Sequence, residues 1–377
     1  SGRWKSIGGD YHTSPVVYQS FTSGNENLKV DVSDIVEQWI KGDKANYGFG
    51  IKLAEKYEGY FSASQAEKDA SIDGSSSGSV SPHSPNGAKA SYSTKNFFAR
   101  TTEFYYKRPT LEARWESIVK DDRNRFQLSS SLLPAGDNLN NLYFYNYING
   151  RLTDIPTYQA TDPVLKLYYS SGSVPEGSAI TFVRSDGNTQ SSISATRIAT
   201  GSYKVSIAVP KTAVTTTYPY LVDVWEYDGT EILTGSAFEP KAFRPSQNTS
   251  ASSYVISMPN LKKEYHRHDI ARMNLFVREK KWSPNVYSVA KSTPENLTMV
   301  SASYRVLRAV DGYEVTSHIT GNIKATALSY DNSGSYFNMH MNQFEVGFQY
   351  ILKFAFYDGY TKSYVEQPYE FKFRVID

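Results

Sequence analysis

The chain contains no cysteine in its 377 residues, which excludes disulfide bonds and thiolate metal sites. Its domains must therefore be held together by packing and hydrogen bonds, and such a protein suits assembly in a reducing cytoplasm. No apolar run approaches the ~18 residues that a membrane-spanning helix requires, and no charged-then-apolar leader stands at the start. The sequence thus predicts neither a membrane span nor a secretion signal.

The chain also lacks an excess of charge of either sign. The 40 basic and 38 acidic residues give a formal net charge of +2, so electrostatics favour neither nucleic acid nor an anionic membrane as a partner. The P-loop, H-E-x-x-H and Rossmann fingerprints are absent as well. We therefore expect no enzymatic activity, no cofactor, and no catalytic or metal-ligating residue.

Aromatic residues are abundant instead. The chain has 30 Tyr and 19 Phe, and 40% of its residues are hydrophobic, which is enough apolar material to form real cores. Aromatic and β-branched side chains fit the half-buried surface of a sheet, so the composition favours strands. At about 100 to 150 residues per domain, the length predicts about three domains in series. We expect an all-β protein.

The first segment, residues 1–118, combines one helix with predicted strands. Apolar residues from Asp31 to Lys41 recur at helical spacing, with Asp31 placed to cap the helix and Gly42 to end it. A run rich in Ser, Gly, Asn and Pro over 70–95 predicts a long loop. The predicted strands span 46–53, 97–100, 102–106 and 108–115.

Residues 119–162 are predicted to connect the first segment to the next domain. They contain an aromatic run over 142–147 that predicts a strand pair, with Asn149-Gly150 as its turn. This part of the chain has the character of a linker that docks on a neighbouring domain.

Two further domains follow, over 163–245 and 246–377. Short apolar runs alternate there with Asp-Gly, Thr-Gly and Ser-Gly turn signals, a spacing typical of small immunoglobulin-like sandwiches. Strands are predicted over 165–169, 179–184, 192–198, 202–209 and 220–227, and then over 269–279, 301–309, 323–330, 336–341, 349–357 and 369–375.

The densest histidine cluster is the run Tyr265-His266-Arg267-His268-Asp269. In a strand, His266 and His268 share a face and could reach one metal ion, but further ligands would have to come from elsewhere. A polar strand entry at a domain boundary explains the run more simply.

Two carboxylate pairs deserve the same comparison, because glycoside hydrolysis needs two acids across a sugar bond. Asp31 and Asp34 are better explained by helix capping and the helix dipole, and Asp121 with Asp122 by a solvated charged break. The spacing of neither pair predicts a reaction centre.

The tyrosines leave two interpretations open. Exposed aromatic rings with nearby polar groups bind sugars by stacking, yet the same rings are favoured in cores and protein interfaces. The candidates for a glycan or interface surface are Tyr57, Tyr60, Tyr143, Tyr145 and Tyr147.

Several runs in the first segment resemble a known family. The order DVSDIVEQW (31–39), NYGFGI (46–51), FFAR (97–100) and RPTL (108–111) is similar to a DNRLRE-type module. A close variant resembles structural proteins of large tailed phages, notably marine ones with T4-like virions. That likeness continues through KDDR (120–123), DNLNNLY (137–143) and GRL (150–152), so it covers roughly the first 155 residues.

The resemblance implies a jelly-roll-type β-sandwich and a structural duty for each matched residue. Trp39 would hold the helix on the sandwich, Gly48 and Gly50 would relieve crowding, and Arg100 and Arg108 would pair with acids near a sheet edge. Asp31 and Pro109 belong to the same structural motif. Because the module's usual first strands are missing before the Trp4 region, a complete sandwich is expected to need an upstream segment or a neighbouring subunit.

These observations predict a non-enzymatic virion protein of a tailed phage. It would be located at the neck, the capsid surface or the tail, assembled in the host cytoplasm, and would act as a spacer and docking surface. The expected partners are other virion proteins, with self-association into a homo-oligomer or symmetric ring. The alternative is a carbohydrate-binding adhesin that attaches to glycans of the host surface.

Overall fold

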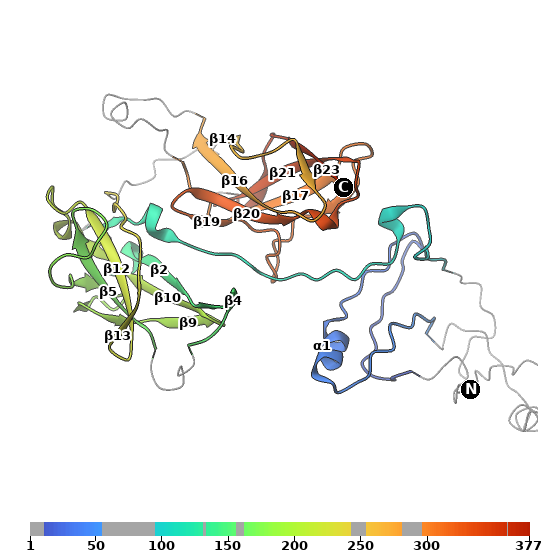
Figure 1. The fold of residues 1–377 in the computed structure, drawn as a ribbon, viewed down its shortest axis with the longest axis horizontal. Helices are drawn as coiled ribbons and strands as arrows, with labels where there is room; N and C mark the ends of the chain where they lie inside the picture. The colour runs from blue at the N-terminus through green and yellow to red at the C-terminus, as the bar shows by residue number, and fades with distance from the viewer. Residues whose placement is uncertain are drawn as a thin grey trace, which may run out of the picture. The chain divides into compact units, whose positions relative to one another are not determined.

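A computed structural model describes residues 11–54, 95–130, 133–155, 162–242, 254–280, 296–359 and 361–377 (Figure 1). The chain divides into two compact units, Ser1–Pro109 and Thr110–Asp377. The second unit contains two β-sandwiches in tandem, each with its own hydrophobic core. The all-β, tandem-sandwich prediction is confirmed for this part of the chain.

The first unit contains the predicted helix, α1 (Ser33–Lys41). The Asp31 carboxylate accepts hydrogen bonds from the Ser33 backbone N–H and hydroxyl, at 2.9 and 2.6 Å, just ahead of the first turn. The helix ends at Gly42, whose φ of 81° is the left-handed conformation that glycine adopts without strain. The helix prediction is thus confirmed, with a start two residues later than expected. The N-cap residue is Val32 and not the predicted Asp31.

The strands predicted before residue 116 do not form. Among the described residues ahead of Leu128, the structure has α1, the 3₁₀ turns η2 (Tyr105–Lys107) and η3 (Asp122–Arg125), and no strand. The alternating residues Tyr47 and Ile51 are 79% and 64% exposed. Alternation predicts a strand only if a partner strand covers one face, and the described residues of this unit supply none.

The first sandwich has two main sheets, of order β2-β10-β9 and β13-β12-β5-β8, with short two-stranded sheets at their edges. Its strands are β1 (Leu128–Ser129), β2 (Asn140–Tyr145), β3 (Tyr147–Ile148), β4 (Arg151–Leu152), β5 (Val164–Ser170), β6 (Phe182–Val183), β7 (Thr189–Gln190), β8 (Ile193–Ser194), β9 (Thr196–Ala199), β10 (Ser202–Ile207), β11 (Val209–Pro210), β12 (Tyr220–Tyr227) and β13 (Thr230–Thr234). Two 3₁₀ turns, η4 (Ala135–Asn138) and η5 (Lys211–Ala213), connect them.

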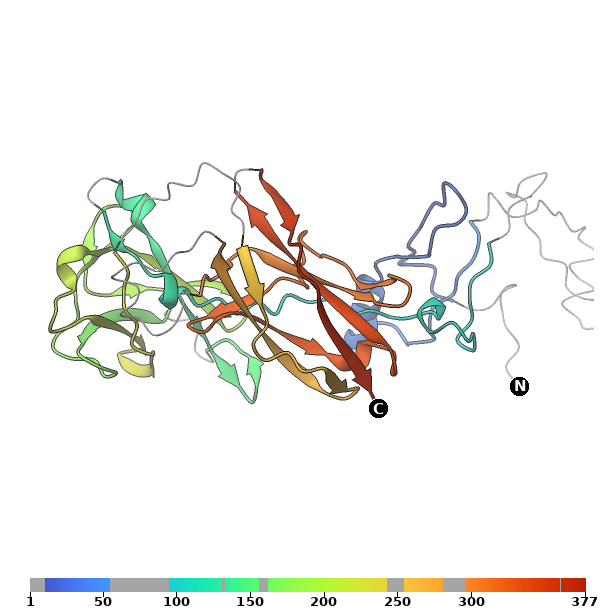
Figure 2. The ribbon, with the colours of Figure 1, turned by 90° about the horizontal axis from the view of Figure 1, so that it is seen from above.

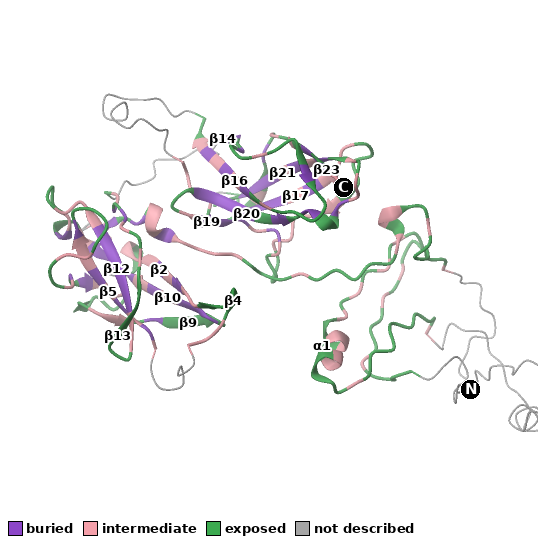
Figure 3. Cartoon of the chain, viewed as in Figure 1, coloured by how far each residue is buried: buried purple, intermediate pink, exposed green. Residues whose placement is uncertain are grey.

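Three aromatic rings join the two layers of this sandwich. Phe144 on β2 stacks with Tyr203 on β10 and with Trp225 on β12, at centroid distances of 5.7 and 5.5 Å. Trp225 and Tyr203 are fully buried, and the buried class is concentrated on these strands in Figure 3. Burial of large aromatic rings is the main stabilising contribution to such a core.

Residues 119–162 differ from the predicted connecting segment. Strand β2 pairs with β10 along its whole length, from Asn140↔Ile207 to Tyr145↔Ser202, and Leu142 is a buried core residue. A strand whose partner lies some 60 residues away carries no local sign of that partner, so its sequence predicts a strand without its pairing. The Asn149-Gly150 turn is confirmed, since both residues have positive φ between β3 and β4.

The second sandwich has sheets of order β14-β16-β20-β19 and β15-β23-β21-β17-β18, with β22 also paired to β21 (Figures 1 and 2). Its strands are β14 (Tyr254–Ser257), β15 (Glu264–His266), β16 (Ile270–Glu279), β17 (Ala302–Arg308), β18 (Glu314–Thr316), β19 (Ser329–Asp331), β20 (Gly334–His340), β21 (Gln349–Asp358), β22 (Ser363–Glu366) and β23 (Phe371–Ile376). The 3₁₀ turn η6 (Met341–Gln343) follows β20.

The core of the second sandwich again rests on rings that meet between layers. Tyr304 on β17 stacks on Phe337 of β20 at 4.4 Å, and Phe337 meets Phe354 of β21 edge-on at 5.9 Å. Phe354, Phe356 and Phe373 are buried, and Phe371, which alternates with Phe373 on β23, is partly buried. The strand predicted over 323–330 is mostly irregular, and only β19 forms there.

Candidate functional site at the joint of the two sandwiches

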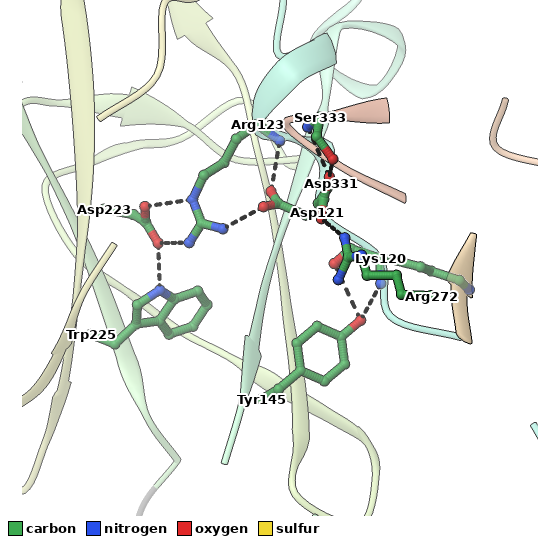
Figure 4. Close-up of polar contacts among 9 residues, drawn as sticks. All are labelled: Lys120, Asp121, Arg123, Tyr145, Asp223, Trp225, Arg272, Asp331 and Ser333. Carbon is green, nitrogen blue, oxygen red and sulfur yellow. Dashed lines mark hydrogen bonds and ion pairs between the residues drawn. The ribbon is translucent and has the colours of Figure 1, made fainter. Parts of the chain in front are cut away.

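Residues 118–125, here called the joint segment, contact both sandwiches. The Val119 N–H donates to the Ser329 hydroxyl at 3.1 Å, and the Val119 carbonyl accepts from the Tyr330 N–H at 3.0 Å. On the other side, the Lys120 N–H donates to the Tyr145 hydroxyl at 2.8 Å (Figure 4). The segment therefore joins β19 of the second sandwich to β2 of the first by hydrogen bonds.

Arg123 anchors the joint segment in the first sandwich. Its Nε and Nη2 donate to the two carboxylate oxygens of Asp223, at 2.9 and 2.6 Å, and its Nη1 lies 3.1 Å from Asp121 (Figure 4). Asp223 is on β12 between Leu221 and Trp225, on the face that points into the core, and is fully buried. The Trp225 Nε1–H also donates to Asp223, at 2.7 Å.

The charge balance explains why this buried carboxylate is tolerated. A buried acid without a partner is strongly unfavourable. An arginine that binds both carboxylate oxygens compensates the negative charge and donates two directed hydrogen bonds. Burial by itself would lower the pKa of Arg123, but the charge and hydrogen bonds of Asp223 outweigh it and the pKa is raised. Gly235 faces the same carboxylate, and a Cβ there would lie 2.1 Å from Asp223 Oδ1.

A small open cavity lies beside the joint segment, and we call it the joint pocket. Its volume is about 160 Å³, and its walls come from both sandwiches and from the joint segment. The charged and polar lining residues are Lys120, Asp122, Arg125, Asn141, Ser301 and Lys324, and the aromatic ones are Tyr143, Tyr330 and Tyr364. Three cations and one carboxylate leave the lining with an excess of positive charge.

Asp122 is the one acid of the joint pocket, and only 5% of it is exposed. Burial raises its pKa above the ordinary 3.8, although Arg125 and hydrogen bonds from Tyr330 and Asn141 oppose that shift. Arg125 Nε lies 3.3 Å from Asp122 Oδ1, yet that oxygen accepts no hydrogen bond from the described residues. This oxygen is itself buried from solvent, so it is enclosed by the protein and is not open to the pocket.

Of the five predicted glycan or interface tyrosines, the structure brings two to the joint. Tyr143 lines the joint pocket, and burial raises its pKa to about 12. Tyr145 stacks beside it at 6.2 Å and holds the joint segment through its hydroxyl. Tyr147 is 53% exposed on the β3–β4 hairpin, while Tyr57 and Tyr60 lie outside the described residues.

The residues given structural duties by the family resemblance lie in the first unit. The Trp39 ring contacts Phe49 at a centroid distance of 4.9 Å, so it packs the helix against the following segment instead of a sheet. A Cβ at Gly48 or Gly50 would meet no atom within 4 Å, so neither glycine relieves crowding here. Gly48 is required by its φ of 86° instead.

The predicted ion pairs of Arg100 and Arg108 do not form within the described residues. Arg108 Nε donates to the Thr102 carbonyl at 2.9 Å, and its guanidinium lies 5.6 Å from the centre of the Tyr105 ring. Pro109 ends the first compact unit and belongs to no strand. Without a sheet edge in this part of the described chain, the acids expected beside these arginines are not brought near.

A serine, a histidine and a carboxylate meet on the second sandwich, and sequence reasoning missed them. Ser303 Oγ lies 3.1 Å from His318 Nδ1, and His318 Nε2 lies 3.6 Å from Glu366. Ser303 is fully buried and also shares a 2.8 Å hydrogen bond with Thr326, so in this arrangement it is closed to a substrate. The cluster fastens the 318–326 segment to β17. No motif could reveal residues so far apart in the chain.

In the histidine run, His266 makes hydrogen-bond contacts with Asp269 and with the backbone of Asp377. The His266 N–H donates to Asp269 at 3.0 Å, and His266 Nδ1 lies 2.8 Å from the Asp377 carbonyl. Over the parts of the chain that the structure describes, no three His, Asp or Glu side chains gather as a metal site. In the same parts, no helix has the length and hydropathy needed to cross a bilayer.

Comparison with known proteins adds no identification. No family model and no curated protein matches the chain. Among solved structures, it is similar to Escherichia coli alpha-2-macroglobulin activated by porcine elastase, with 13% identity, a TM-score of 0.20, and coverage of 65% of this chain and 19% of that one. It is also similar to a DUF4785 family protein from Legionella pneumophila, with 10% identity, a TM-score of 0.20 and 71% of each chain covered.

The chain spans less than a fifth of the length of the alpha-2-macroglobulin chains that it matches. At TM-scores of 0.18 to 0.20, these likenesses carry no argument about the fold or the function of this protein. The functional argument therefore rests on the joint and its pocket.

Proposed function

We propose that this chain is a non-enzymatic structural protein of a tailed-phage virion, with the tandem sandwiches acting as a spacer of defined geometry. The observation that carries the proposal is the joint segment, which is hydrogen-bonded to both sandwiches and anchored by the buried Arg123–Asp223 pair. Domains on a free linker are expected to move independently, whereas a linker that is itself paired and buried restricts that motion. A spacer needs such restriction.

The virion assignment draws on the resemblance of the first 155 residues to phage structural proteins. A structural component would be present in fixed copy number on a symmetric particle and would self-associate through a repeated interface. Exposed apolar side chains in the first unit, such as Tyr47 and Ile51, give it surface to bury against a neighbour.

The test is to locate the chain on particles. Purified virions are labelled with gold-conjugated antibody raised against this chain, and density for the two sandwiches is sought in a cryo-EM reconstruction. We expect label at one site of the particle, in a copy number that matches the local symmetry. A protein absent from washed particles, and monomeric in analytical ultracentrifugation at every concentration, would contradict the proposal.

A second proposed function is attachment to a host-surface glycan. The joint pocket favours it, because the pocket places the Tyr143 ring beside hydrogen-bonding and charged groups in a cavity open to solvent. Binding of the full chain to an array of bacterial polysaccharides tests this role in general. It is independent of the spacer function, since a spacer needs no ligand.

A further inference from the structure

We infer that residues 46–53, here called the alternating run, pair as antiparallel strands with the same run of a second copy of this chain, about a two-fold axis at Gly50. This deepens the first proposed function, on which it rests, by naming the interface for self-association. Three features carry the inference: the exposed apolar side chains of the run, its self-complementary order, and the helix that packs against it.

The apolar side chains of the alternating run have no cover. Those at alternate positions are 79%, 47%, 64% and 40% exposed, in the order Tyr47, Phe49, Ile51 and Leu53. The residues between them are Gly48, Gly50 and Lys52. As a strand, the run would therefore have one apolar face and one small or polar face. No described residue of the first unit is buried, so within these residues the apolar face is left to solvent.

A second copy fits because the run is self-complementary about Gly50. In an antiparallel pair centred there, Tyr47 lies opposite Leu53 of the second copy, and Phe49 lies opposite Ile51 of the second copy. Each apolar side chain thus meets another on the same face, an arrangement that stabilises paired strands.

The charges of the run agree with the same register. Lys52 is the one charged residue between 46 and 53, and it lies opposite Gly48 of the second copy, so no like charges meet. Both copies present the same surface across a two-fold axis, so the interface is closed and gives a dimer.

Helix α1 supplies a second layer for the paired strands. The Trp39 ring lies 4.9 Å from the Phe49 ring, so the helix packs against the apolar side chains of the run. Ile40 in the same helix is 80% exposed. Two strands alone are marginally stable, but packing against a helix makes them stable. The dimer joins two strands and two helices around one apolar layer.

The two glycines permit the pairing. Gly48 has a φ of 86°, and its N–H donates to the Asn46 side chain at 3.0 Å. Glycine adopts extended and left-handed backbone about equally readily, so straightening the run at Gly48 carries little steric cost. Gly50 has no positive φ, and a Cβ there would meet no atom within 4 Å. The centre of the pair therefore accepts an added side chain.

The first experiment is a disulfide test on the full chain. The chain has no cysteine, so Gly50→Cys introduces the one thiol. Directly opposite residues of antiparallel strands have Cα atoms about 4.5 to 5.5 Å apart, which a disulfide spans. We expect mild oxidation to convert most of this variant to a covalent dimer. Gly172→Cys, at another sterically open glycine, is the control and should stay mostly monomeric.

The second experiment checks the register by sedimentation. Phe49→Glu and Ile51→Lys each place a charge against an apolar side chain, and each alone should weaken self-association at least about tenfold. When the two variants are mixed, the introduced glutamate faces the introduced lysine, and one Phe49–Ile51 contact remains. We expect the mixture to recover the lost association. Val310→Glu, at an exposed apolar residue of the second sandwich, should associate like the parent.

The inference is overturned if Gly172→Cys forms dimers as readily as Gly50→Cys, if Phe49→Glu associates like the parent, or if the mixture fails to recover. Association that these variants leave unchanged, in a chain located on particles, would reject this interface and leave the proposed function standing. Dimers of Gly50→Cys, from a chain absent from washed particles, would support the interface and reject the virion role.

Discussion

At the scale of single residues, Asp223 is a buried charge whose stability depends on its hydrogen-bond and ion-pair partners. Its carboxylate faces a hydrophobic core and depends on Arg123 and Trp225 for compensation. Replacing one partner of a buried ion pair costs more than the pair contributes, because the other charge is left uncompensated.

We therefore expect Asp223→Asn to lower the free energy of unfolding of the first sandwich by about 3 kcal/mol. Urea denaturation of the full chain measures the change. Asp186→Asn is the control, because Asp186 is exposed in a turn and its replacement keeps the hydrogen bond from the Asn188 N–H. Equal stability of Asp223→Asn and the parent would show that the buried pair is not required.

Gly235 provides a steric test of the same site. The position has no positive φ, so an alanine is excluded by the Asp223 carboxylate that a Cβ would approach to 2.1 Å, not by the backbone. We expect Gly235→Ala to destabilise the first sandwich by about 2 kcal/mol, as overpacking does. Gly172→Ala, where the space is open, should be close to neutral in the same denaturation series.

At the scale of elements, the 3₁₀ turn η3 places a buried acid at the joint. Because burial raises the pKa of Asp122 above 3.8, the folded chain holds this proton more tightly than the unfolded chain. The stability that the folded chain gains from protonation of Asp122 is fully present below pH 3.8. It is lost as the pH rises through the raised pKa of Asp122.

We expect Asp122→Asn, which resembles the protonated acid, to be more stable than the parent at neutral pH and to match it in acid. Thermal unfolding across this pH range measures the difference. Arg125 and Asp121 also face the group, and neither is altered by the substitution. Asp137→Asn, at an exposed position, should follow the parent curve throughout. A variant that is less stable at neutral pH would contradict the assignment.

Strand prediction succeeded or failed according to where each partner strand lies. Strand β12 matches its predicted bounds, and β16, β17 and β21 differ by a residue or so, because their alternation is strong and their partners are present. The run 46–53 alternates as clearly, but it forms no strand and its residues are exposed. Alternation states which face is apolar, and only a paired neighbour converts it into a strand.

At the scale of the whole molecule, the joint segment decides whether the second unit behaves as a spacer. The chain has no cysteine, so two introduced cysteines are the only sites for spin labels. Thr230→Cys on β13 and Lys372→Cys on β23 place one label on an exposed position of each sandwich.

We expect a single narrow distance distribution between these labels in double electron–electron resonance. Tyr145→Phe removes the hydroxyl that accepts from the Lys120 N–H and should broaden the distribution. Tyr147→Phe, on the exposed hairpin, should leave it unchanged. A broad distribution in the parent would mean that the sandwiches move independently and would remove the main support for the spacer function.

The sequence by itself determined the all-β class, the helix near residue 33, most strands of the two sandwiches and the Asn149-Gly150 turn, because each depends on local alternation, capping or turn chemistry. Only the tertiary structure decided that β2 belongs to the first sandwich, that Arg123 reaches Asp223 and that Tyr143 lines a pocket. The physical reason is sequence distance. These groups are neighbours only after folding, and no local pattern in the chain records which distant residue will satisfy a buried charge or complete a cavity.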